Sequence, residues 1–517
     1  MSLLLLPEEL VLQIMRHLRD SQDIRTLKSA ACTCSWLRRA AEVYLYSTAK
    51  FTTLSSLYQY DHAVQAEPRR ASYLRDLKLL YSTGVYDYYR PPLPLDLTLF
   101  TNLESFVSES PECQPQSVKE THWNLFMDSY MQAFKQASLL AESIQARTPL
   151  RNLRTITLHW SGSQDRFWDI TPKCPIFLLP LLQSLEISCA RIGQGESNEW
   201  AAEELERFSR QTRLKSLVLT ECVVSVEALH AILSFPNALQ TLVLHEKFYH
   251  HREVGDRFAV EDTITFNRAI AQQAESLEHL EIFRHSQFAD GGKTLLLSLD
   301  NFRMLSHLQL GPYLSMRPDG TRYFTFALAT PVPEALQSLR LDEYAISMLK
   351  GSRAEKVLSD LSVAELLTNA EARGFSFTLD ISLQHLPRLF AGIRFGNQDA
   401  RPAVRKLIES FESHFQTRQE ASIRSRPEAI SKDPSEIQAS SRLRILTNKP
   451  RYKIPPFLHD EGPQRFVVRY DSNHPERFLS YPYTANALPP NRDDSSDDED
   501  MDVAFSGTGH VDPRLLA

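Results

Sequence analysis

One stretch of the chain decides the fold: Leu214-Lys215-Ser216-Leu217-Val218-Leu219-Thr220-Glu221-Cys222-Val223-Val224. Leu217 and Leu219 alternate with other residues, and a period of two is typical of a β-strand with one apolar face. Ser225 follows directly and can cap a helix over the apolar positions of 226–233. The stretch therefore predicts one unit, in which a short strand is followed by a helix that returns along its outer side.

The leucine spacing of this stretch recurs along the middle of the chain. A leucine, two other residues, an aliphatic residue, one more residue and a second aliphatic residue stand in this order at seven places, which begin at Leu153, Leu182, Leu214, Leu239, Leu277, Leu305 and Leu336. Two weaker copies begin at Leu74 and Leu103, and successive copies start 29, 50, 29, 32, 25, 38, 28 and 31 residues apart. One copy alone is equally compatible with a core strand or a helix face, but a series is typical of stacked repeats.

The copy that begins at Leu214 is similar to the consensus of leucine-rich repeats as far as Cys222. This resemblance implies an α/β solenoid over residues 51–385, with parallel strands on its concave side and helices and loops outside. The unequal steps predict an irregular arc with insertions. The step of 50 residues holds an amphipathic stretch between Trp123 and Ile144, which predicts a helix there.

The pattern changes after the last copy. We expect a helix over 355–372, a strand over 375–381, and helices over 386–421 that close the open end of the solenoid. From about residue 422 the composition turns to Pro, Ser, Arg and Asp. Residues 422–517 are therefore predicted to be a mostly disordered tail, with one short strand at 465–470.

The pattern of the first 50 residues predicts helices, and these helices carry more apolar side chains than so small a segment can bury. Pro7 suits the first turn of a helix, and Glu8 and Glu9 complement the positive end of the helix dipole. Apolar residues then recur at steps of mostly three or four, at Leu10, Ile14, Leu18, Ile24, Leu27, Ala31, Cys34, Leu37 and Ala41. A segment of this size needs support from outside itself. Two readings stay open: a docking module for a partner protein, or a helical cap on the repeats.

Three blocks in this segment form a pattern: Leu6-Pro7-x-Glu9-Leu10-x-x-x-Ile14-x-x-His17-Leu18, then Thr26-Leu27-x-x-Ala30-x-x-Thr33-Cys34-x-x-Leu37, then Ala41 with Leu45-Tyr46. The pattern resembles a fungal-type F-box, although Ala30 and Ala31 replace bulkier aliphatic residues and Trp36 is displaced by one place. F-boxes dock onto a Skp-type adaptor and so join a cullin-RING ubiquitin ligase. The resemblance implies an F-box domain over residues 1–50 that docks through Leu6, Pro7, Glu9, Leu10, Ile14, Leu18, Ile24, Leu27, Cys34 and Leu37.

The repeats also predict which side chains a ligand would meet. In each copy we expect the third, fifth and seventh positions to face the open concave surface. Among these 21 positions Arg340 is the one permanent cation, whereas a reader of phosphorylated peptides needs clustered Arg or Lys. We therefore expect the face to bind a largely uncharged protein, the alternative being solvated strand surface without a ligand. The residues predicted to contact a protein substrate are Thr157, His159, Val218, Val243, His245, Glu281, Phe283, His307, Gln309 and Arg340.

Composition argues against several other classes of function. No apolar run among the 517 residues is long enough to cross a membrane, so we expect an intracellular protein of the cytoplasm, the nucleus or both. Seven acidic residues in the run 493–502 equal the whole net charge of -7, so nothing indicates nucleic acid or an anionic membrane as partner. Six scattered cysteines without a CxxC pair indicate neither a disulfide framework nor a zinc site.

Patterns of catalysis are missing too. His245 stands five and six residues before His250 and His251, whereas the HExxH metalloprotease pattern needs an interval of four. The sequence has no Gly-rich phosphate loop and no GxSxG elbow. We therefore expect no enzyme, no cofactor and no metal, and predict an adaptor that links a target protein to a Skp-type subunit for ubiquitination. The alternative is a leucine-rich-repeat scaffold or regulatory protein without substrate turnover.

Overall fold

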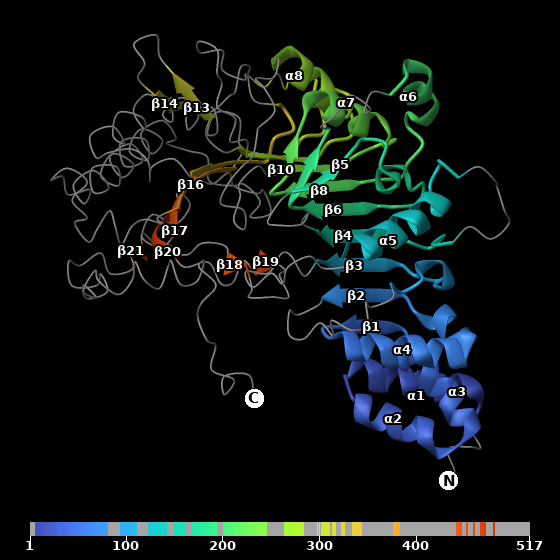
Figure 1. Cartoon of the computed structure of the whole chain (residues 1–517). Coiled ribbons are helices and arrows are strands. Elements are labelled where there is room, and N and C mark those ends of the chain that lie inside the picture. Colours follow the sequence, from blue (N-terminus) through green and yellow to red (C-terminus); the bar gives the residue numbers. More distant parts are fainter. Residues whose placement is uncertain are drawn as a thin grey trace, which may run out of the picture. The chain divides into compact units, whose positions relative to one another are not determined.

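A computed structural model describes residues 6–80, 94–110, 123–141, 149–160, 167–193, 200–245, 263–283, 297, 299, 301–310 and 333–343, and short strands within 313–325, 376–382 and 441–480. It shows an α/β fold that combines helices with a parallel β-sheet (Figure 1). The described residues fall into two compact units, the first ending at Leu239 and the second beginning at Gln240. This boundary lies inside residues 51–385, which the sequence analysis treats as one domain.

Three helices open the first unit: α1 (Glu8–Asp20), α2 (Ile24–Thr33) and α3 (Ser35–Leu45). Pro7 precedes α1, where its missing N–H costs no hydrogen bond. The Asp23 carboxylate caps α2, because it accepts hydrogen bonds from the amide of Thr26 at 3.1 Å and from its hydroxyl at 2.6 Å. We call residues 6–46 the helical segment, and its buried core consists of Val11, Met15, Leu27, Leu37, Ala40 and Ala41. The prediction of helices over the first 50 residues is confirmed.

A ladder of parallel strands makes up the rest of the first unit. Its strands are β1 (Thr48–Phe51), β2 (Asp76–Leu80), β3 (Ser105–Glu109), β4 (Thr155–His159), β6 (Ser184–Ser188) and β8 (Ser216–Thr220). Each leucine-spaced copy supplies one strand. The aliphatic or aromatic residue at the second strand position is fully buried and aligns with its neighbours across the ladder, at Leu77, Phe106, Ile156, Leu185 and Leu217.

The backbone hydrogen bonds of this first ladder repeat from strand to strand. The carbonyl of Gln183, which precedes β6, accepts bonds from the amides of Lys215 and Ser216 at 2.8 and 3.0 Å. The carbonyls before the other strands accept pairs of amides in the same way, at Ser47, Arg75, Glu104 and Arg154. Because these bonds need no particular side chain, strands can stack alike although the chain between them varies in length.

The chain returns between these strands through α-helices and short 3-10 helices, the latter labelled η. They are α4 (Leu54–Ala66), η2 (Pro68–Tyr73), η3 (Leu97–Leu99), α5 (Trp123–Ala137), η5 (Pro175–Leu178), α6 (Ala202–Phe208) and α7 (Val226–Ser234). The predicted helix in the longest step is α5, which buries Phe126, Tyr130 and Phe134. Ser225 caps α7 as expected, accepting a bond from the Ala228 amide at 3.1 Å. A second small sheet contains β5 (Trp168–Ile170), β7 (Ala190–Ile192) and β9 (Val223–Val224).

The second unit has a ladder of the same kind. Its parallel strands are β10 (Thr241–His245), β11 (His279–Phe283), β12 (His307–Leu310), β15 (Ser338–Glu343), β16 (Ser376–Ser382) and β17 (Ser441–Leu446). Helix α8 (Thr263–Ala271) lies between β10 and β11 in the sequence, and β13 (Tyr313–Met316) pairs antiparallel with β14 (Arg322–Thr325). The strand predicted over 375–381 is confirmed as β16.

The tail holds more strands than the sequence predicts. The strand predicted over 465–470 is present as β20 (Phe466–Asp471), which pairs antiparallel with β17. The additional strands after residue 422 are β17 itself, β18 (Arg451–Tyr452), β19 (His459–Asp460) and β21 (Leu479–Ser480). Alternating apolar and basic residues mark β17 in the sequence, but the Pro- and Ser-rich composition around it obscures this pattern. The helices predicted over 355–372 and 386–421 and the acidic run 493–502 lie outside the described residues.

Candidate functional site

The helical segment exposes large aliphatic side chains. Leu10 and Ile14, one helical turn apart on α1, are 44% and 37% exposed, and Ile24 at the start of α2 is 42% exposed. Their neighbours Val11 and Met15 are 0% and 2% exposed. Of the seven large apolar residues that are exposed in the described part of the chain, these three belong to the helical segment. Helix α1 therefore has two apolar stripes, one in the core and one facing solvent.

Not all of the ten predicted docking residues reach the surface. The exposed ones are Pro7, Glu9, Leu10, Ile14 and Ile24, and the half-buried ones are Leu6, Leu18 and Cys34. The placement of Leu27 and Leu37 on a docking surface is wrong, because they are 0% and 6% exposed and lie in the core of the three helices. Three short helices need an interior of their own, and the apolar period does not distinguish an inward stripe from an outward one.

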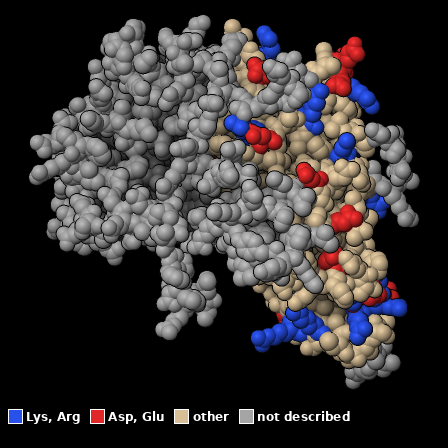
Figure 2. Space-filling view, viewed as in Figure 1, with Lys and Arg blue, Asp and Glu red and all other residues tan. Residues whose placement is uncertain are grey.

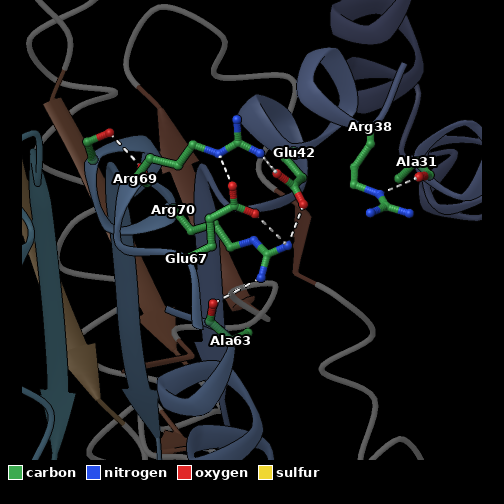
Figure 3. Close-up of polar contacts among 8 residues, drawn as sticks. Ala31, Arg38, Glu42, Ala63, Glu67, Arg69 and Arg70 are labelled. Carbon is green, nitrogen blue, oxygen red and sulfur yellow. Dashed lines mark hydrogen bonds and ion pairs between the residues drawn. The ribbon is translucent and has the colours of Figure 1, made fainter. Parts of the chain in front are cut away.

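A buried carboxylate joins the helical segment to the chain that leads into β2. Glu42 of α3 is 3% exposed and accepts hydrogen bonds from Arg70 at 2.6 Å and Arg69 at 3.1 Å (Figure 3). Glu67 pairs with Arg69 at 2.7 Å and with Arg70 at 3.3 Å. The Arg70 guanidinium also lies 5.1 Å from the centroid of the Tyr46 ring. These contacts form one charged network that connects the helical segment to the start of the ladder.

The strand face of the first ladder is less open than predicted. In β3, β4, β6 and β8 the first and third residues are half-buried, whereas the second, fourth and fifth are buried. Thr157 and Val218 hold third positions and are half-buried, so part of each side chain is accessible. His159 holds a fifth position and is 4% exposed, so the prediction that it faces an open surface is wrong. The turn after β6 covers it, since Cys189 Sγ lies 3.8 Å from His159 Nε2.

The ends of these strands enclose a buried polar cluster. Cys189 follows β6 and Glu221 follows β8, and both have a positive φ, of 60° and 53°. Cys189 Sγ lies 3.8 Å from Glu221 Oε2 as well as from His159. A thiol, an imidazole and a carboxylate recur in nucleophilic catalysis, but Cys189 and Glu221 are both 0% exposed, so no substrate reaches the thiol. The cluster belongs to the interior of the ladder, and its members are too far apart in sequence to form a motif.

A group of three histidines and one glutamate lies on the strand face of the second unit. Glu281 of β11 accepts hydrogen bonds from His245 Nε2 at 3.1 Å and His279 Nε2 at 2.7 Å. The ring of His279 lies 5.9 Å from that of His307, its register partner on β12. The side chains of His245, Glu281 and His279 are 25%, 19% and 34% exposed, so the group is accessible to solvent.

The histidines hold the Glu281 carboxylate in its ionised form. Burial disfavours the charge, but the hydrogen bonds from His245 and His279 and their electrostatic attraction outweigh burial and lower the pKa of Glu281 to about 2. Glu281 therefore carries a negative charge throughout the physiological range. Both of its oxygens are engaged, so the carboxylate orients the two imidazole rings.

The remaining predicted contact residues have mixed positions. Gln309 and Arg340 are half-buried and lie in one register row with Glu281, on β12 and β15. The placement of Val243 on an open surface is wrong, because it is 8% exposed. Phe283 ends β11, but its side chain lies outside the described part. The predicted contact residues that share an accessible face of the second unit are thus His245, Glu281, His307, Gln309 and Arg340.

Other kinds of site find little support in the described part of the chain. Within it, no three His, Cys, Asp or Glu side chains are grouped to hold a metal ion, and five free cysteines are present. None of the helices described is both long and apolar enough to cross a membrane. Neither a protein-family model nor a curated protein matches this chain. In the described part of the chain, the accessible surfaces with grouped side chains are the outer stripe of the helical segment and the strand face of the second unit.

Proposed function

We propose that this chain is a substrate-recognition adaptor of a cullin-RING ubiquitin ligase, acting in the cytoplasm or nucleus. In this proposal the helical segment is an F-box that binds a Skp-type subunit. The strand ladders are parts of a leucine-rich-repeat solenoid that binds the protein to be ubiquitinated. The observation that carries the proposal is the exposure of Leu10, Ile14 and Ile24 on helices whose core is already filled.

The two stripes of α1 favour docking over the alternative of a helical cap. A cap needs one apolar stripe, directed inward, and Val11 and Met15 supply it. Leu10 and Ile14 add nothing to that core and remain at the surface. Complete burial of an aliphatic side chain is worth roughly 1.5–3 kcal/mol, so an outward stripe supplies binding free energy to a partner. The F-box resemblance places its docking residues at these same positions.

The repeated geometry of the ladders supports the solenoid. Within each unit the strands of the ladder stack in parallel register although the chain between them varies in length, and the carbonyls before most of these strands accept a pair of amides in the same way. Stacked repeats of this kind build extended binding faces from side chains that alternate along the strands. We assign substrate contact to the accessible positions, with His245, Glu281 and His307 in the second unit as principal members.

The proposed role requires no chemistry from this chain. Binding a substrate and the ligase at once turns ubiquitin transfer into a reaction between neighbours, which raises the effective concentration of the acceptor lysine. That gain depends on a firm connection between the two binding sites. Within the first unit, the network of Glu42 with Arg69 and Arg70 connects the helical segment to the start of the ladder.

Capture of a Skp-type subunit tests the proposal. The full-length chain should retain the purified subunit, and Leu10→Asp with Ile14→Asp should reduce retention at least tenfold, because two charges then replace the outward stripe. Leu99→Asp is the matched control, since Leu99 is 46% exposed but lies outside the helical segment. It should leave retention unchanged.

Two results would contradict the proposal. One is failure of the wild-type chain to retain the Skp-type subunit. The other is equal retention by the wild type and the Leu10→Asp, Ile14→Asp variant. If retention is confirmed, the cellular level of captured proteins separates substrate turnover from scaffolding, because only substrates marked for degradation accumulate when the chain is deleted.

A further inference from the structure

The helical segment has a second surface property besides its outward aliphatic stripe. Between Ile24 and Ala41 the chain carries four cations, Arg25, Lys28, Arg38 and Arg39, and no acidic residue. All four cations are exposed. Figure 2 shows Lys and Arg side chains gathered over the helical segment. The surface of α2 and α3 is thus basic, although the chain outside the run 493–502 has equal numbers of acidic and basic residues.

Three of these cations line α2: two belong to this helix and the third comes from α3. Arg25 and Lys28 are one turn apart on α2, next to the exposed Ile24. Arg38 of α3 donates a hydrogen bond from Nε to the Ala31 carbonyl at 3.1 Å, which holds its guanidinium beside the last turn of α2 (Figure 3). A helix of ten residues is about 15 Å long. Arg25, Lys28 and Arg38 therefore form a row of positive charge along α2 that begins beside Ile24. We call these three residues the α2 row.

The carboxylates of the helical segment do not neutralise the α2 row. Asp20 pairs with Arg16 at 3.8 Å and with Arg19 at 2.6 Å, both on α1. Asp23 stands two residues before Arg25 and interacts with it electrostatically, but two hydrogen bonds from Thr26 hold the Asp23 carboxylate as the cap of α2. Within the described residues no carboxylate forms an ion pair with Arg25 or Lys28 of α2, or with Arg38 or Arg39 of α3.

We infer that the α2 row meets an acidic surface on the Skp-type subunit, so that carboxylates of the partner surround the apolar site that receives Ile24. This inference rests on the proposed function and adds the charge of the partner to it. Opposite charge on two partners accelerates their encounter, and this acceleration falls as salt shortens the screening length. The α2 row therefore controls the association rate, whereas the aliphatic stripe controls dissociation.

A protein partner fits the α2 row better than a nucleic acid does. A nucleic-acid surface is recognised mainly through phosphate contacts, for which an exposed isoleucine amid the cations is of no use. A protein interface combines apolar anchors with charged flanks, which is the combination that Ile24, Arg25 and Lys28 present. An RNA duplex therefore serves as the competing probe in the experiment.

The test measures association of the full-length chain with the purified Skp-type subunit by stopped-flow mixing. Raising NaCl from about 50 to about 300 mM should slow wild-type association about tenfold. Arg25→Glu with Lys28→Glu should slow it at least tenfold at low salt and leave the dissociation rate nearly unchanged. The control combines Arg16→Glu with Arg39→Glu, which changes the net charge by the same amount outside the α2 row, and it should have a smaller effect.

Each outcome bears on the inference separately from the proposed function. If the subunit binds but its association rate changes neither with salt nor with the double substitution Arg25→Glu and Lys28→Glu, the inference is wrong and the proposed function stands. Equal slowing by the control Arg16→Glu with Arg39→Glu would also overturn it, because net charge would then explain the effect. Tighter binding of the RNA duplex than of the subunit would assign the α2 row to nucleic acid. If the subunit does not bind at all, both proposals fail.

Discussion

The helical segment and the first ladder use their aliphatic residues in different ways. In the ladder, residues at the second strand position, such as Leu185 and Leu217, are 0% exposed, and polar residues face outward. In the helical segment, Leu10 and Ile14 remain at the surface beside buried Val11 and Met15. Each strand of the ladder covers its neighbour, so stacking of the strands buries their apolar residues inside the ladder. Within the described residues the outer stripe of α1 has no such cover, and the proposed function assigns the docking of a partner to that stripe.

The largest effect should come from the interior of the ladder. Leu217→Ala should lower the free energy of unfolding of the first unit by about 2–5 kcal/mol, because it leaves a cavity at a fully buried position. Leu10→Ala should change it by less than about 0.5 kcal/mol. All five tryptophans lie before Gln240, so tryptophan fluorescence during urea unfolding reports on the first unit. Equal losses of unfolding free energy in Leu217→Ala and Leu10→Ala would contradict the stated difference between the ladder and the helical segment.

The next effect concerns the connection between the two regions. Glu42→Gln should destabilise the first unit by about 3 kcal/mol, because it leaves two guanidinium groups beside an uncharged buried side chain. Glu67→Gln is the matched control, since the Glu67 side chain is 36% exposed, and it should cost under about 1 kcal/mol. The same fluorescence measurement applies. A harmless Glu42→Gln would mean that the helical segment is held mainly by apolar packing.

A smaller effect distinguishes the strand face of the second unit from that of the first. The pKa of Glu281 is lowered to about 2, so its ionised form stabilises the fold above the unfolded value of about 4.3. This contribution disappears as the pH falls from there towards the folded pKa. Glu281→Gln should therefore cost about 2 kcal/mol at neutral pH and progressively less below about pH 4.

Circular dichroism during urea unfolding measures the free energy of unfolding of the wild type and of Glu281→Gln, at neutral pH and below about pH 4. Glu278→Gln provides the control, because Glu278 lies on the same stretch of chain with an exposed hydrogen bond to Gln240. It should have little effect at either pH. An effect of Glu281→Gln that does not change with pH would show that the histidines do not hold the carboxylate ionised.

Local patterns predicted the elements of this fold well. The leucine spacing located each strand of the first ladder from β2 to β8, and Ser225 marked the start of α7. Both depend on neighbours a few residues away, namely the period of two along a strand and the hydrogen bond of a cap to the first turn. Apart from β20, the strands of the tail escaped prediction, and β17 among them relies on pairing with β16, about sixty residues earlier.

The candidate sites were less accessible to sequence reasoning. The period of three to four predicted the apolar positions of the helical segment but could not separate core residues such as Leu27 from surface residues such as Ile24. Nor could it reveal the contact of Glu42 with Arg69 and Arg70, which joins residues 27 and 28 positions apart. These features depend on how three helices and a turn meet in space.

The sequence by itself determined the strands that carry the leucine spacing, which side of each of these strands is apolar, and that the first 50 residues are amphipathic helices. These properties follow from periodicity, which each short stretch carries alone. Only the tertiary structure decided that His159 is buried, that Leu10 and Ile14 are exposed, and that His245 and His279 donate hydrogen bonds to Glu281. Exposure and hydrogen bonding depend on residues that arrive from other repeats or helices, and no local pattern specifies that arrangement.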